Sequence, residues 1–170
     1  VRFKNQSLIA PDRTILGADQ ERWLDSELQA SKARGTTWQI LGQQVLIGKL
    51  GLPVLTDEEL KLDQTVPEYR PLLQMMQTLA KDSLPFNLDA WDGYAACRDR
   101  VFTSLAKHGV NPVVLAGDTH NAWAFNLADS AGQAMGIEIG TPGVNSPGLE
   151  TYLETEPEVL GQAMRNASPE

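Results

Sequence analysis

Two residues with metal-binding chemistry, Asp118 and His120, directly follow a short apolar segment of the sequence. The stretch "VVLAGDTH" covers residues 113–120, and Gly117 separates its apolar residues from the acid and the imidazole. A carboxylate oxygen and a neutral imidazole nitrogen suit zinc, manganese or iron. An isolated Asp-x-His is more often a turn with satisfied polar side chains, but ligands of layered α/β folds gather where loops leave strand carboxyl ends. The context therefore favours a shared metal site, whose remaining ligands come from elsewhere.

Other reactive side chains give weaker signals. His108 lies where a helix is expected to end and Cys97 lies on an apolar helical face, so structural roles are expected for both. The loop "GTPGVNSPG" presents Asn145 and Ser146, but its spacing alone indicates only a loop. The sequence contains no serine nucleophile motif, phosphate-binding glycine loop or CxxC pair.

The composition is that of one ordinary domain, which we assign to residues 1–170. Apolar residues make up 42% and charged residues 21% of the 170 residues, and the net charge of −8 argues against a nucleic-acid surface. One cysteine allows no internal disulfide, and no apolar stretch is long enough to predict a transmembrane helix. The opening "VRFKNQSLIAPDR" resembles no signal peptide and lacks an initiator methionine, so we expect a section of a longer protein.

Apolar periodicity predicts three helices. The first covers about 18–33, the second begins near Pro67, and the third is capped by Asp89 or Asp92 and ends at Gly109. Helical spacing predicts burial against a sheet for seven residues of the first and third helices: Trp23, Leu24, Leu28, Tyr94, Cys97, Val101 and Leu105.

With the strand-like segments added, the predicted order is helix, strand, helix, helix and then three strands. Strands are predicted in "TWQILGQQVLI", "NPVVLAGD", "AWAFNLAD" and "MGIEIGTPG", with a surface excursion over 48–67 and a weakly helical tail after Pro147. This order indicates an α/β fold in which a layered sheet has flanking helices.

Five segments in a fixed order resemble the PhoD-like alkaline phosphatases. They are "DRTILGADQERWL", "WQILGQQV", "WDGYAACRDRV", "VVLAGDTHNAWAFNL" and "IEIGTPGVNSPG", and together they span residues 12–148. The resemblance implies part of the four-layer α/β/β/α metallophosphatase fold. It also implies a mainly structural role for the signature at 91–94.

The resemblance also implies roles for individual residues. Asp118 and His120 match the family's late Gly-Asp-x-His metal ligands, and Asn121, Asn145 and Ser146 are expected to orient substrate or ligands. The metals implied are divalent or ferric ions: iron, calcium, manganese or zinc. The family's earlier ligands and its late Arg-Gly-Tyr strand have no counterpart here, so the chain resembles an interior and C-terminal section of a catalytic domain.

The function implied is hydrolysis of phosphomonoesters or phosphodiesters by metal-activated water in a secreted or periplasmic enzyme. We expect the isolated chain to be inactive. It should expose an apolar sheet face, normally covered by the remainder of the parent domain, through which it self-associates. The alternative is a non-catalytic α/β module that binds a ligand or a protein.

Overall fold

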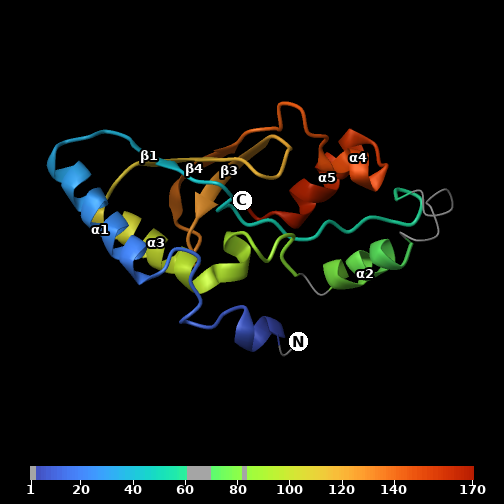
Figure 1. Ribbon diagram of the computed structural model, residues 1–170, viewed down its shortest axis with the longest axis horizontal. Coiled ribbons are helices and arrows are strands. Elements are labelled where there is room, and N and C mark those ends of the chain that lie inside the picture. The colour runs from blue at the N-terminus through green and yellow to red at the C-terminus, as the bar shows by residue number, and fades with distance from the viewer. Residues whose placement is uncertain (1–2, 61–69, 82–83) are drawn as a thin grey trace.

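The computed structural model describes residues 3–60, 70–81 and 84–170, and within them four strands form one mixed sheet (Figure 1). The strand order is β1-β2-β4-β3; β1, β2 and β4 are parallel and β3 is antiparallel to β4. The strands are β1 (Gln39–Gly42), β2 (Pro112–Ala116), β3 (Trp123–Ala128) and β4 (Ala134–Gly140). The predicted α/β fold is confirmed.

The helices flank this sheet and its carboxyl-terminal loops. They are α1 (Ala18–Ala33), α2 (Arg70–Lys81), α3 (Ala95–His108), α4 (Leu149–Leu153) and α5 (Pro157–Ala167), with a π-helix at Phe3–Ser7 and a 3-10 turn at Trp91–Tyr94. Figure 1 shows α1 and α3 together on one side of the sheet. No helix among the described residues is long and apolar enough to cross a membrane.

The helix boundaries follow the sequence signals in most places. Helix α1 has the predicted bounds, and α3 ends at Gly109, which adopts the left-handed conformation with φ 57°. The prediction that Asp89 or Asp92 caps α3 is wrong, because the helix begins after Tyr94 and has no side-chain cap. The prediction for Pro67 lies outside the described residues.

The core lies between one sheet face and the pair α1 and α3. Sheet residues Val114, Phe125 and Leu127 are buried in one cluster with residues of both helices: Leu28, Cys97, Val101, Phe102 and Leu105. Leu24 and Tyr94 are partly buried against that cluster. The predicted burial of Trp23 is wrong, since its side chain is 62% exposed and lines a groove beside Ile40.

The opposite sheet face is apolar and exposed. Ile40, Leu115, Ile137 and Ile139 are 59%, 42%, 42% and 41% exposed, although apolar side chains of this size favour burial. Leu115 of β2 is directly in register with Ile139 of β4, so the patch is continuous across strands. We call these four residues the open face.

The segment after β1 is buried without being a strand. The sequence predicted one strand over 37–47, but β1 ends at Gly42 and residues 45–48 are buried as an irregular segment. The carboxylate of Glu138, fully buried on β4, accepts hydrogen bonds from the N–H groups of Ile47 and Gly48 at 2.8–3.1 Å. These bonds hold the segment against β4 without a strand ladder.

Candidate active site

A tight turn at the carboxyl end of β2 carries the two predicted metal ligands. Asp118 and His120 both have left-handed backbones, with φ 70° and 63°. Residues other than glycine rarely adopt this conformation, and such strain concentrates at functional sites. Two hydrogen bonds hold the turn. The Gly117 N–H donates to the Gln44 carbonyl at 3.2 Å, and Trp123 Nε1–H donates to Thr119 Oγ1 at 2.6 Å.

Asp118 and His120 have different neighbours. Asp118 lines a small hollow together with Gly48 and Asp92. The His120 ring lies against the loop after β4, where its Nδ1 is 3.2 Å from the Pro147 carbonyl oxygen. Both residues are exposed and neither enters the apolar core. Their convergence on one metal ion stays a prediction.

The loop after β4 lies at the same edge of the sheet. Because β2 and β4 are parallel, their carboxyl ends coincide, and the Gly143 N–H bonds to the His120 carbonyl at 2.9 Å. This loop carries Asn145, which is exposed, and Ser146, which is half-buried. The structure therefore places two of the three predicted substrate-binding residues, Asn145 and Ser146, on the loop that contacts His120.

Asn121 uses its carboxamide within the chain. Its Oδ1 accepts a hydrogen bond from the Leu149 N–H at 3.0 Å, and its Nδ2 donates to Glu150 Oε2 at 2.9 Å. The predicted contact of Asn121 with substrate stays a prediction. What the geometry displays is a connection between the His120 turn and α4.

Asp92 is an acidic residue of this region for which the sequence predicted a helix cap, and the resemblance a mainly structural role. Its carboxylate accepts a hydrogen bond from the Leu50 N–H at 2.8 Å, and burial raises its pKa to about 6. A carboxyl group that titrates near neutrality beside a candidate ligand is a feature of functional sites. Its place in the Trp-Asp-Gly-Tyr signature at 91–94 was the signal in the sequence that could have singled it out.

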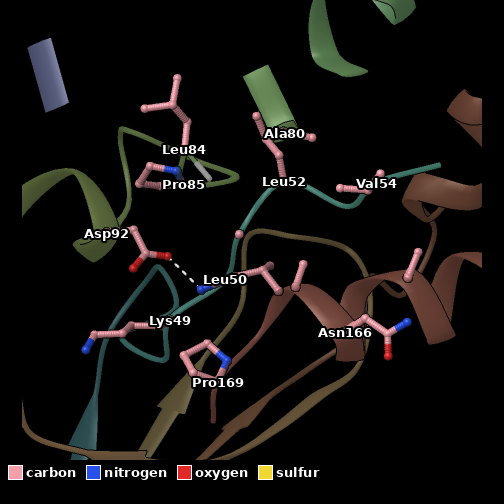
Figure 2. Close-up of a pocket in the computed structure, with 13 residues that line it drawn as sticks. Lys49, Leu50, Leu52, Val54, Ala80, Leu84, Pro85, Asp92, Asn166 and Pro169 are labelled. Atoms are coloured by element: carbon pink, nitrogen blue, oxygen red, sulfur yellow. Dashed lines mark hydrogen bonds between the residues drawn. The ribbon is translucent and has the colours of Figure 1, made fainter. Parts of the chain in front are cut away.

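A cavity of about 460 Å³ shares Asp92 and Leu50 with the hollow beside Asp118 (Figure 2). Its wall is mostly apolar, and Lys49, Asp92 and Asn166 supply its polar side chains. Figure 2 shows the Asp92 carboxylate directed at the Leu50 nitrogen. Asp92 thus lines both this cavity and the hollow beside Asp118.

The rest of the 91–94 segment holds distant parts of the chain together. Trp91 Nε1–H donates to Gln43 Oε1 at 2.7 Å, and the Gly93 carbonyl accepts from Arg13 Nε at 2.8 Å. The Arg13 guanidinium also lies 4.6 Å from the centre of the Tyr94 ring. These contacts agree with the structural role that the resemblance implies for the segment.

The donors present fit a metal ion as part of its coordination shell. Asp118 offers carboxylate oxygens, and no described residue forms a hydrogen bond with Nε2 of His120. Among the described residues, no group of three or more His, Cys, Asp or Glu side chains lies close enough to hold an ion. The turn thus offers two candidate ligands, and the rest of a coordination shell would have to come from elsewhere.

Comparison with known proteins identifies the family of this chain. The family model described as PhoD-like phosphatase matches residues 2–170. Alkaline phosphatase D of Bacillus subtilis (strain 168) is 33% identical over 118 residues, which cover 69% of this chain and 15% of that protein. No solved structure shows a significant match. The chain belongs to the PhoD-like phosphatase family.

Proposed function

We propose that this chain is a section of the catalytic domain of a metal-dependent phosphatase that hydrolyses phosphomonoesters or phosphodiesters. Asp118 and His120 are two of its metal ligands. The observation that carries the proposal is the strained turn at the end of β2, which exposes a carboxylate and an imidazole two residues apart in a chain of this family.

The residues at this edge of the sheet are acidic, so an anionic substrate can bind there only when cations are bound as well. The chain has a net charge of −8, and Asp92 lies near Asp118 at the same edge. Bound iron, calcium, manganese or zinc would neutralise phosphoryl oxygens and lower the pKa of an attacking water. Asn145 and Ser146 offer an amide and a hydroxyl that orient a phosphoryl oxygen from the adjacent loop.

The open face indicates a surface that another part of the parent domain covers. Four exposed aliphatic side chains on one sheet face require a cover, and we propose that the remainder of the parent domain provides it and supplies the missing ligands. Without that cover the chain self-associates and has negligible turnover. Secretion or a periplasmic location is proposed from the family alone, and cell fractionation tests it.

The function is tested by turnover in the parent protein. We expect D118A and H120A to lower kcat/KM on a chromogenic phosphodiester and monoester by more than the roughly 10–100-fold typical of outer-shell changes. Manganese, calcium and iron are supplied separately. H108Q is the control, because this second histidine lies at the far end of α3, bonded to Asp25. An inactive parent, or one that H120A leaves unchanged, favours the non-catalytic binding module.

A further inference from the structure

We propose that Asn121 is a positioning residue, which clamps the loop after β4 so that the Pro147 carbonyl fixes the tautomer of His120. The imidazole then carries its proton on Nδ1 and presents the Nε2 lone pair outward. The inference rests on the proposed function for its consequence, but its geometry and its test do not require a metal.

The clamp consists of one carboxamide with two partners of opposite type. The Leu149 N–H can only donate, so Oδ1 of Asn121 faces it at 3.0 Å; the Glu150 carboxylate can only accept, so Nδ2 faces it at 2.9 Å. Both partners thus require the same orientation of the amide. Asn121 therefore joins the His120 turn to the start of α4 by two directional bonds.

The clamp determines where Pro147 lies. Pro147 and Gly148 are the two residues before Leu149, so the bond from Asn121 to Leu149 limits how far the Pro147 carbonyl can move from the neighbouring His120. At the other side of the loop, the Gly143 N–H donates a hydrogen bond of 2.9 Å to the His120 carbonyl. The loop is thus attached at two points on either side of the exposed His120 ring.

The tautomer follows from the acceptor. A carbonyl oxygen has no proton to give, so the 3.2 Å contact with Nδ1 requires Nδ1–H, and the neutral ring keeps its lone pair on Nε2. A histidine that ligates a metal commonly donates its other N–H to a carbonyl or a carboxylate, which fixes the ring and raises its basicity. The Pro147 carbonyl meets that requirement here.

Gly148 is adapted to the clamp. Its backbone has φ −78°, which any residue adopts, but an added Cβ would lie 2.6 Å from Asn121 Nδ2 and 2.5 Å from Glu150 Oε2. A side chain at 148 would push the two partners apart. G148A therefore disturbs the clamp without removing either of its hydrogen-bonding groups.

His108 serves as an internal reference, because it is expected to have the opposite tautomer. Its Nε2 lies 2.9 Å from Asp25 Oδ1. Hydrogen bonds to the Asp25 carboxylate, of which that from Ser104 has the largest effect, hold the pKa of Asp25 well below its usual range. An ionised carboxylate only accepts, so His108 carries its proton on Nε2. The chain has two histidines, so the two tautomers appear side by side in one spectrum.

The experiment is long-range proton–nitrogen NMR of the metal-free chain, labelled at histidine, at about pH 9, where an ordinary imidazole is neutral. We expect the Nδ1–H pattern for His120 and the Nε2–H pattern for His108, with H120Q giving the assignment. An Nε2–H pattern for His120 in the unmodified chain overturns the inference.

Variants separate the clamp from a general structural role. N121A, and N121D at a pH where both carboxylates are ionised, should move His120 toward the Nε2–H form that free histidine prefers. E150Q keeps an acceptor for Nδ2 and should change nothing. The double variant N121D/E150Q reverses the donor and acceptor of the same bond and should restore the Nδ1–H pattern. If N121A fails to fold, G148A replaces it.

The outcomes also separate this inference from the proposed function. In the parent protein, loss of the clamp should weaken manganese binding by roughly 10–100-fold, with recovery in N121D/E150Q. An unchanged His120 pattern in folded N121A or G148A overturns the clamp, whatever the phosphatase assay gives. A confirmed tautomer in a parent without turnover contradicts the proposed function alone.

Discussion

Arg98 and Glu170 form an ion pair 2.7 Å long with side chains only 2% and 3% exposed. Arg98 also donates from Nε to the Ile47 carbonyl at 2.8 Å and from Nη1 to the Ala128 carbonyl at 3.2 Å. One guanidinium thus connects α3, the segment after β1, the end of β3 and the last residue of the chain. Its donors are matched by acceptors, as a buried charge requires.

Removing one partner of this pair should be costly. We expect R98M to lower the free energy of unfolding by about 3–5 kcal/mol, because Glu170 would keep its charge in a buried site. Urea titration of the chain measures the change. R22M is the control: Arg22 pairs with Asp19 on the surface of α1, where an ion pair contributes about 0–1 kcal/mol. Equal losses in the two variants would contradict the role given to Arg98.

The buried carboxyl of Asp92 should make stability fall as pH rises. Its pKa is about 6 in the folded chain and 3.8 for the ordinary side chain, so between these values the folded state binds more protons than the unfolded state. The contribution of Asp92 to the free energy of unfolding is therefore greatest below about pH 4 and declines until about pH 6. The shift corresponds to about 3 kcal/mol at most.

D92N isolates this contribution. The amide oxygen keeps the acceptor for the Leu50 N–H but does not titrate, so the variant should gain stability relative to the unmodified chain between pH 4 and pH 6. Subtracting the two curves removes the contribution of Glu138, whose pKa burial also raises. A difference that is flat over this interval would contradict the burial of a charge at Asp92.

Gly93 should tolerate no side chain. A Cβ at this position would lie 1.8 Å from the Leu88 carbonyl oxygen, a backbone atom that moves only with the whole turn. We expect G93A to destabilise the chain by roughly 1–3 kcal/mol, as overpacking does, measured as a lower midpoint of urea unfolding. G42A is the matched control, since nothing lies within 4 Å of its added Cβ. A midpoint unchanged by G93A would show that the turn is not closely packed.

Local patterns predicted the elements that local physics determines. The period of α1, the Gly109 terminus of α3 and the apolar run of β2 depend on neighbours in sequence, and all three are confirmed. The position of Asp118 and His120 after a strand followed from the same run. The expected burial of Trp23 failed because the period gives a face of a helix but not what covers it.

The features that were missed depend on partners far along the chain. Arg98 lies on the apolar side of α3 because of a carboxylate 72 residues away. The buried segment 45–48 is held by Glu138 of β4, which bonds the N–H groups of Ile47 and Gly48, and no pattern within the segment indicates this. The clamp of Asn121 likewise needs Glu150, which enters only when two loops meet at one sheet edge.

The open face should make the chain self-associate. Ile137 and Ile139 are adjacent outward positions of β4, in register with Val113 and Leu115 of β2, so two copies can bury a continuous apolar surface. We expect sedimentation velocity to show dimers or larger species whose fraction rises with concentration. I137K and I139K should shift the chain toward monomer, because a lysine at either position would lose hydration in the interface.

The matched control for this surface is V144K. Val144 is as apolar as the isoleucines and is fully exposed, at 103%, but it lies on the loop after β4 and outside the open face. The same charge added there should leave the association unchanged. If V144K dissociates the chain as strongly as I139K, net charge and not the open face controls assembly. If the unmodified chain remains monomeric at high concentration, the open face alone does not provide enough free energy for two copies to associate.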